Sequence, residues 1–226
     1  GSEMCIRDRY YMQDDYGNVT LVNVSGIYDE QPLFIDKLKK GGAGVIDAVS
    51  MTGTNGYCDD MAKENFREMM KEYPTKGIHF IDGGNYHYLT LLWLSLIEEP
   101  FDLIVFDNHS DMQKPAFGDV LSCGGWIRNL VEDSGFKGKV TVVGVDKDNI
   151  DKEMKELGVK FITKQTILKK RGQQYGLENE LIDKCWTGKR PVYISVDKDV
   201  LDEKEYKTNC CLLYTSDAAD DLIGVD

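Results

Sequence analysis

The sequence predicts an α/β fold with a mostly parallel sheet. Short runs rich in β-branched residues alternate with longer amphipathic stretches, which is the pattern of strand–helix repeats. Several of these runs, such as 103–106 and 192–196, are continuously apolar, as expected of strands covered on both faces. Polar clusters follow the runs directly, and functional residues of parallel sheets collect at the carboxyl ends of the strands.

The individual elements follow from the same patterns. Strands are predicted over residues 19–24, 77–82, 101–107, 140–145, 160–163 and 191–197. Helices are predicted over residues 60–73, 88–98, 121–133, 151–157 and 166–186. The first helix should bury one face, which carries Met61, Phe66, Met69, Met70 and Tyr73.

Composition narrows the class of protein. The 226 residues include 27 basic and 39 acidic side chains, and the net charge of −12 argues against a nucleic-acid or anionic-membrane partner. An apolar content of 42% is typical of a globular domain, and no apolar run approaches the ~20 residues of a membrane span. The six cysteines show no CxxC spacing and are expected to be reduced thiols. With no leader pattern, we expect a soluble cytoplasmic protein.

Both ends of the chain look foreign to the domain. Residues 1–9 fit no structural period and are tag-like, and residues 210–226 follow a well-organised charged segment abruptly. Strings in both ends resemble translated read-through of sequencing adapters. We therefore expect one natural domain over residues 10–209, cut before its own C-terminus.

The strongest cluster of candidate ligands leaves the apolar run 103–106. It places Asp107, His109 and Asp111 at positions i, i+2 and i+4. In extended backbone these side chains share one face and converge on one point. This pattern is hard to explain as a solvated surface, and it predicts a metal site.

Two further clusters follow other predicted strands. Asp197 and Asp199 follow the run 192–196, and Gly83-Gly84 leads to His87 after the run 78–82. Taken alone, an Asp-x-Asp pair is usually a loop or a helix cap, and His87 could simply begin a helix. His79, inside a predicted strand, is interpreted as a core or edge histidine.

Taken together, the clusters predict a metal centre. Four carboxylates gathered at one sheet edge repel one another and are costly to desolvate without a cation. Carboxylates with two imidazoles and no thiolate suit Mn²⁺, Fe²⁺ or Zn²⁺ better than Ca²⁺, and two ions better than one. Two such metals can activate a water for attack on an electrophilic carbon.

The three motifs, in this order, resemble those of the ureohydrolase family, which includes arginase, agmatinase and formimidoylglutamase. The family pattern is Gly-Gly-Asp-His, then Asp-Ala-His-x-Asp, then Ser-x-Asp-x-Asp-x-x-Asp. The corresponding stretches here are Gly83-Gly84-Asn85-Tyr86-His87, Asp107-Asn108-His109-Ser110-Asp111 and Ser195-Val196-Asp197-Lys198-Asp199-Val200-Leu201-Asp202. The resemblance extends over about residues 19 to 209.

The resemblance implies a three-layer α/β/α sandwich with a binuclear manganese centre. It also implies that a hydroxide bridging the metals, held by Asp111, attacks the carbon of an amidine or guanidine and cleaves its C–N bond. Family members often form homo-oligomers. By analogy one metal would be bound by His87, Asp107, Asp111 and Asp197, and the other by Asp107, His109, Asp197 and Asp199.

Three departures from the family pattern bear on function. The first motif carries an extra residue before His87, and Cys123 stands where arginases have a proton-shuttling histidine. A thiol there can carry protons, which would make Cys123 catalytic together with Asp111, or it can fill space. The acidic residue that receives the substrate would lie beyond the third motif, so the sequence does not identify the substrate.

Other families and roles were weighed against this interpretation. Histone-deacetylase-like enzymes use fewer carboxylates around one zinc, and in haloacid-dehalogenase-type phosphatases the Asp-x-Asp motif opens the domain. The remaining alternative is a relative of the ureohydrolases that binds metal or a partner without turnover, and Cys123 is its main support.

Overall fold

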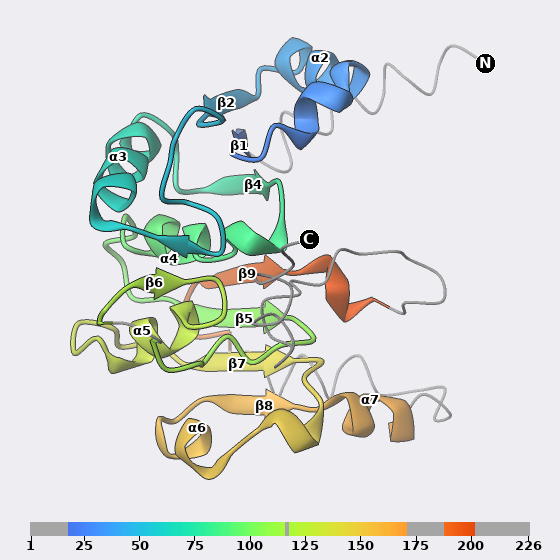
Figure 1. The fold of residues 1–226 in the computed structure, drawn as a ribbon. Coiled ribbons are helices and arrows are strands. Elements are labelled where there is room, and N and C mark those ends of the chain that lie inside the picture. The colour runs from blue at the N-terminus through green and yellow to red at the C-terminus, as the bar shows by residue number, and fades with distance from the viewer. Residues whose placement is uncertain (1–17, 116–117, 171–187, 202–226) are drawn as a thin grey trace, which may run out of the picture. The chain divides into compact units, whose positions relative to one another are not determined.

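The computed structural model describes residues 18–115, 118–170 and 188–201. The chain divides into two compact units, Gly1–Ile97 and Glu98–Asp226, which are taken in turn (Figure 1). The expected foreign ends, residues 1–9 and 210–226, lie outside the described residues, and the single domain over 10–209 stays a prediction.

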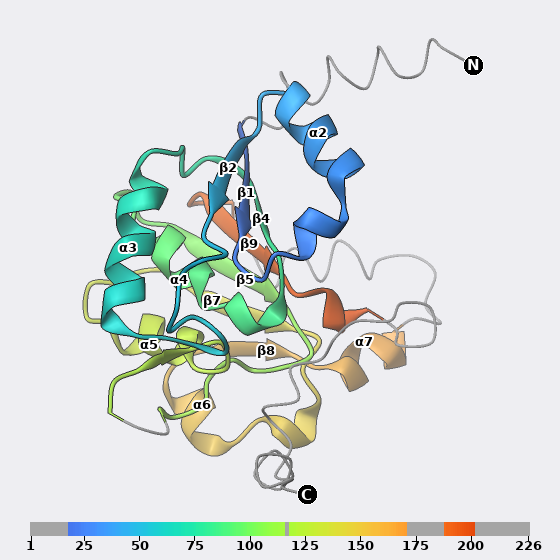
Figure 2. The same cartoon turned by 45° about the horizontal axis from the view of Figure 1, so that its top comes forward.

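The N-terminal unit is built on a three-stranded parallel sheet in the order β2-β1-β4 (Figure 2). The central strand of this sheet is part of the hydrophobic core, because its residues Leu21 and Val22 are fully buried. Val22 pairs with Ile46 on one side and with Ile81 on the other. The strands are β1 (Asn18–Asn23), β2 (Gly44–Asp47) and β4 (Gly77–Ile81), and a short strand β3 spans Tyr57–Cys58.

Helix α3 (Asp60–Lys71) shows why the helices of this unit form where they do. The Asp59 side chain accepts a hydrogen bond from the Ala62 amide and so caps the first turn. Phe66 and Met70 are fully buried, whereas Met61, predicted on the same face, is 76% exposed because the buried stripe runs through Ala62, Phe66 and Met70 at i,i+4 spacing. The other helices of the unit are η1 (Ile27–Glu30), α2 (Pro32–Lys40), η2 (Gly84–Tyr86) and α4 (Leu89–Leu94).

The C-terminal unit contains a four-stranded sheet in the order β8-β7-β5-β9, with every pair parallel. Val105 and Val142 are paired and fully buried, and Ile104, Val143 and Ile162 form a further buried cluster. The strands are β5 (Asp102–Phe106), β7 (Val140–Val143), β8 (Lys160–Ile162) and β9 (Val192–Val196), and a short strand β6 spans Leu121–Ser122. The helices are α5 (Trp126–Glu132), η3 (Lys147–Asn149), α6 (Lys152–Glu156), α7 (Lys164–Lys170) and η4 (Lys198–Val200).

The parallel sheets with connecting helices confirm the α/β class and the six predicted strands. Strand β2 and helix α2 were missed. The helix predicted from residue 121 begins only at Trp126, because Leu121–Ser122 is a strand and a turn with two glycines follows it. Of the helix predicted over 166–186, α7 covers the start, and residues 171–187 lie outside the described residues.

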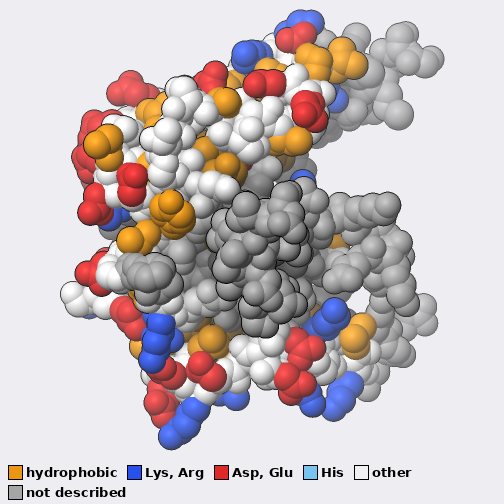
Figure 3. Space-filling view, in the orientation of Figure 1, with side chains coloured by type: hydrophobic (Ala, Val, Ile, Leu, Met, Phe, Trp, Pro, Cys, Tyr) orange, Lys and Arg blue, Asp and Glu red, His pale blue; other side chains and the backbone are white. Residues whose placement is uncertain are grey.

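The surface is charged and mixed in sign. Acidic and basic side chains are interspersed on the face of each unit seen in Figure 3. Helix α3 carries three exposed ion pairs at i,i+3 spacing, among them Lys63 with Asp60 at 2.6 Å, and such pairs contribute only about 0.2–0.5 kcal/mol each. Within the described residues, no helix has the length and apolarity that crossing a membrane requires.

Gly144 lets the ends of β7 and β5 approach closely. Its φ is +118°, and a Cβ placed on it would lie 2.7 Å from the Asp107 carbonyl oxygen and 2.5 Å from Val200 Cγ2. The site described below therefore requires glycine, the residue without a Cβ, at this position.

We expect Gly144→Ala to lower the free energy of unfolding by at least about 2 kcal/mol, since it adds overlap to backbone strain. The control is Gly158→Ala, where φ is +83° but nothing lies within 4 Å of the new Cβ, and strain alone should cost about 1 kcal/mol. Urea unfolding of both variants measures the difference. Equal losses would contradict the role of close packing at Gly144.

Candidate metal centre

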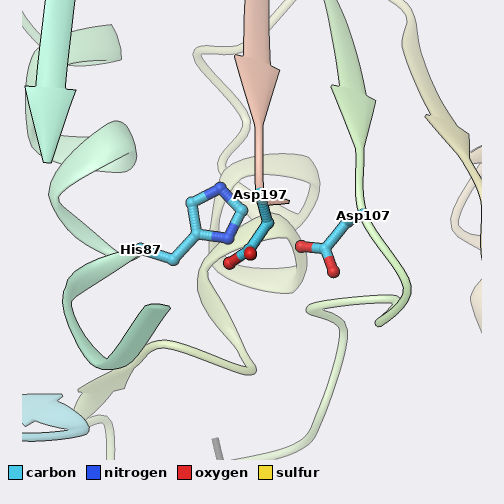
Figure 4. Close-up of side chains that lie close together, drawn as sticks. All are labelled: His87, Asp107 and Asp197. Atoms are coloured by element: carbon cyan, nitrogen blue, oxygen red, sulfur yellow. The ribbon is translucent and has the colours of Figure 1, made fainter. Parts of the chain in front are cut away.

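Two carboxylates meet at the carboxyl edge of the C-terminal sheet. Phe106 pairs with Val196 in the parallel register of β5 and β9, so the next residues, Asp107 and Asp197, emerge side by side. The Asp197 amide donates to the Phe106 carbonyl at 2.8 Å, which extends the ladder by one residue. Ligand oxygens of Asp107 and Asp197 lie within 4.8 Å of each other, and Figure 4 shows both side chains at the strand ends.

A tight turn brings Asp199 back to the same edge. Asp197 Oδ1 accepts a hydrogen bond from the Asp199 amide at 3.0 Å and so caps the short helix η4. Asp199 Oδ1 accepts from the Asn108 amide at 3.1 Å. Asp107 and Asp199 are only 1% and 9% exposed, so two buried carboxylates are held beside each other by backbone donors.

His109 completes a group of three candidate ligands. Ligand atoms of Asp107, His109 and Asp199 all lie within 4.8 Å of one another, with His109 Nδ1 2.8 Å from Asp199 Oδ2. Interactions with Asp107 and Asp199 raise the pKa of His109 to about 11, because the two carboxylates stabilise positive charge on the ring. The electrostatics of the cluster thus favour a cation at this edge.

Asp111 is held by a different set of contacts. Its Oδ2 accepts a hydrogen bond from Trp126 Nε1 at 2.6 Å, and its carbonyl accepts from the Ile127 amide in the first turn of α5. Its φ is +49°, and the side chain belongs to neither group of clustered ligand atoms. The predicted convergence by strand alternation is wrong in its geometry, since β5 ends at Phe106 and the following residues are not extended.

Trp126 and Arg128 were missed by the sequence analysis. Arg128 is 4% exposed, and its Nε donates to the Met112 carbonyl at 2.9 Å. Its Nη1 also contacts Glu132 and Glu153. Both side chains therefore fix the segment that carries Asp111, and no spacing in the sequence indicated this.

The other two predicted site residues are buried. His87 is 6% exposed and follows η2 in the N-terminal unit, with its amide donating to the Gly84 carbonyl. Asn85 and Tyr86, which stand where the family pattern has one residue, lie in this single helical turn. Cys123 is 4% exposed and lies between β6 and α5 in the C-terminal unit.

A sequence model of the Arginase family matches residues 28–206. The chain belongs to the arginase family. The family indicated by the three motifs is thereby confirmed. An uncharacterized protein of Thermotoga maritima is 28% identical over 186 residues, which are 82% of this chain and 65% of that protein. The chain thus spans less than two thirds of the length of this relative.

Solved structures show the same fold. Proclavaminate amidino hydrolase of Streptomyces clavuligerus has a TM-score of 0.58 at 16% identity, over 85% of this chain and 71% of the other. Formimidoylglutamase of Bacillus subtilis has a TM-score of 0.57 at 16% identity, over 83% and 66%. Entamoeba histolytica arginase in complex with L-ornithine has a TM-score of 0.56 at 17% identity, over 84% and 78%.

The contact between Trp126 and Asp111 leads to a test. Trp126→Phe removes the indole donor of a buried carboxylate, whereas Trp93→Phe removes an indole nitrogen that has no hydrogen-bond partner among the described residues. Both tryptophans are fully buried, so the loss of volume is matched. We expect Trp126→Phe to cost about 1–3 kcal/mol more in urea unfolding than Trp93→Phe. Equal costs would show that the hydrogen bond contributes no net stability.

Proposed function

We propose that this arginase-family protein is a hydrolase that cleaves a non-peptide C–N bond in a small linear amidine or guanidine, with two manganese ions as cofactors. The observation that carries the proposal is the cluster of Asp107, Asp197, Asp199 and His109 at one sheet edge. The similar solved structures include an amidino hydrolase and an arginase, and the names of both enzymes agree with this class of reaction. A cytoplasmic location and a homo-oligomeric state stay predictions.

The donor set fits the proposed metals. Carboxylate oxygens with imidazole nitrogen suit Mn²⁺, and Fe²⁺ or Zn²⁺ are compatible with the same donors. When bound, such a metal pair lowers the pKa of a water to near neutrality and polarises the electrophile. The proposed ligands are His87, Asp107, His109, Asp111, Asp197 and Asp199, with Asp107 and Asp197 shared between the two ions.

Residues of this chain are proposed to attract the substrate, orient the water and carry protons. The acidic site attracts a cationic amidinium or guanidinium, because negative charge concentrated at one edge raises the local concentration of cations. Asp111, oriented by Trp126, is proposed to hold the attacking water through a hydrogen bond. Cys123 is proposed as a proton carrier, and since it is 4% exposed it would pass protons to neighbouring groups rather than directly to bulk water.

Metal content tests the ligand scheme. After loading with manganese and exhaustive dialysis, elemental analysis should find about two Mn²⁺ per chain in the parent protein. Asp107→Asn and Asp197→Asn should each retain one or fewer, because each removes a charge shared by both ions. Retention of two ions by either variant would count against the scheme.

Asp146→Asn is the matched control for metal content. Asp146 follows β7 in the same sheet and caps η3 with the same hydrogen bond that Asp197 makes at η4. It belongs to neither cluster of candidate ligands, so this variant should bind as much manganese as the parent.

Hydrolysis is tested by incubating the manganese-loaded protein with arginine, agmatine, guanidinobutyrate and formimidoylglutamate. We expect urea from one of the guanidines or formamide from formimidoylglutamate, and loss of that product to background in Asp107→Asn. Two bound metals without turnover of any of the four would favour the alternative, a relative that binds without catalysis.

A further inference from the structure

Two buried acceptor atoms in the N-terminal unit have no hydrogen-bond partner among the described residues. They are Asn23 Oδ1 and Asp82 Oδ1. Asn23 is 5% exposed, and Asp82 directly follows β4. A buried acceptor without a donor costs about 1–3 kcal/mol, so two of them require an explanation.

The strand register places these two side chains together. Val22 pairs with Ile81 in the parallel β1–β4 ladder, so Asn23 and Asp82 are the next residues along neighbouring strands. Aligned residues of parallel strands point to the same side of the sheet. The other carboxylate oxygen, Asp82 Oδ2, accepts hydrogen bonds at 2.6 Å from the amides of Val24 and Ser25, which directly follow Asn23.

The orientation of the Asn23 amide follows from its neighbour. Asn23 Nδ2 lies 3.3 Å from Asp29 Oδ1, and only the amide nitrogen can donate to a carboxylate. The oxygen is therefore the atom without a partner. Burial raises the pKa of Asp82, but while this carboxylate is ionised both remaining atoms are acceptors and neither can satisfy the other. What they then lack is a donor or a positive charge.

The charged groups around Asp82 do not supply this positive charge. No Lys, Arg or His forms an ion pair with Asp82 in the part of the chain that the structure describes. Its negative charge also contributes to the raised pKa values of Tyr28 and Tyr86, where burial is the larger cause, so both phenols lie within its field. Asp29 adds a second carboxylate at the rim, where it is exposed to solvent. The surroundings are thus acidic and polar.

We infer that Asn23 Oδ1 and Asp82 Oδ1, with Asp29 at the rim, form a binding site for a small cation. This site contains none of the proposed manganese ligands. It lies at the edge of the N-terminal sheet and would act separately from the proposed hydrolase centre. A hydrated Mg²⁺ ion, which is commonly held by one or two carboxylates, a K⁺ ion and a small organic ammonium share the required chemistry. Each would supply the positive charge that the two oxygens lack.

The test measures unfolding of the full chain against cation concentration. Parent protein, Asp82→Asn and Asp36→Asn are titrated with MgCl₂, KCl or methylammonium chloride at constant ionic strength, balanced with tetramethylammonium chloride. Asp36→Asn is the control, because Asp36 is an exposed aspartate of helix α2 in the same unit and lies outside the sheet. At about ten times its Kd, the bound cation should lower the unfolding constant of the parent and of Asp36→Asn about tenfold.

Asp82→Asn should lose that response while it keeps the manganese content of the parent, so the result is independent of the proposed hydrolase centre. An identical response in all three proteins, or no response to any of the three cations, would overturn the site; an ordered water or a protonated Asp82 would then satisfy the two oxygens. If Asp82→Asn does not fold, the ¹³Cγ chemical shift of Asp82 in the parent decides. The shift should move on addition of the cation, and an unchanged shift would also overturn the site.

Discussion

The parallel pairing of β5 with β9 is the constraint on which the candidate metal centre depends. Its register aligns Phe106 with Val196 and so brings Asp107 beside Asp197 at the end of two paired strands. Two carboxylates in such a place repel each other and lose hydration, and the fold offsets part of this cost with backbone donors. The amide of Asp199 bonds to Asp197, and the amide of His109 bonds to Asp107. A bound metal would neutralise the negative charge that these backbone donors do not offset.

A second constraint acts through the segment after β5. Asp111 leaves extended conformation with a positive φ, and its carbonyl and carboxylate are both engaged by the start of α5. Arg128 holds the next carbonyl, that of Met112. The orientation of Asp111 is therefore set by helix packing rather than by strand geometry. A change in the first turn of α5 would move this carboxylate without altering any of the clustered candidate ligands.

The same structural principle recurs in the N-terminal unit. There, too, an aspartate emerges where a parallel strand ends, and Asp82 is held by the amides of Val24 and Ser25. The difference lies in the neighbour that the register provides. Asp107 meets another carboxylate and an imidazole, whereas Asp82 meets an amide oxygen. Polar side chains at the carboxyl ends of parallel strands thus produce two sites of different charge and ligand type.

The sequence by itself determined the α/β class, the six main strands and the family, because these depend on local apolar patterning and on motifs of fixed spacing. It indicated Asp107, His109, Asp197 and Asp199 as a group, since all four follow strands closely. It missed strand β2 and helix α2, and it began α5 too early because a strand precedes the turn there.

Only the tertiary structure decided how the side chains meet. The Trp126 side chain reaches Asp111 and that of Arg128 reaches Met112 across 15 residues or more, and Asp82 reaches Val24 and Ser25 across more than 50. Contacts of this kind depend on strand register and helix packing. Neither leaves a local periodic signal in the sequence.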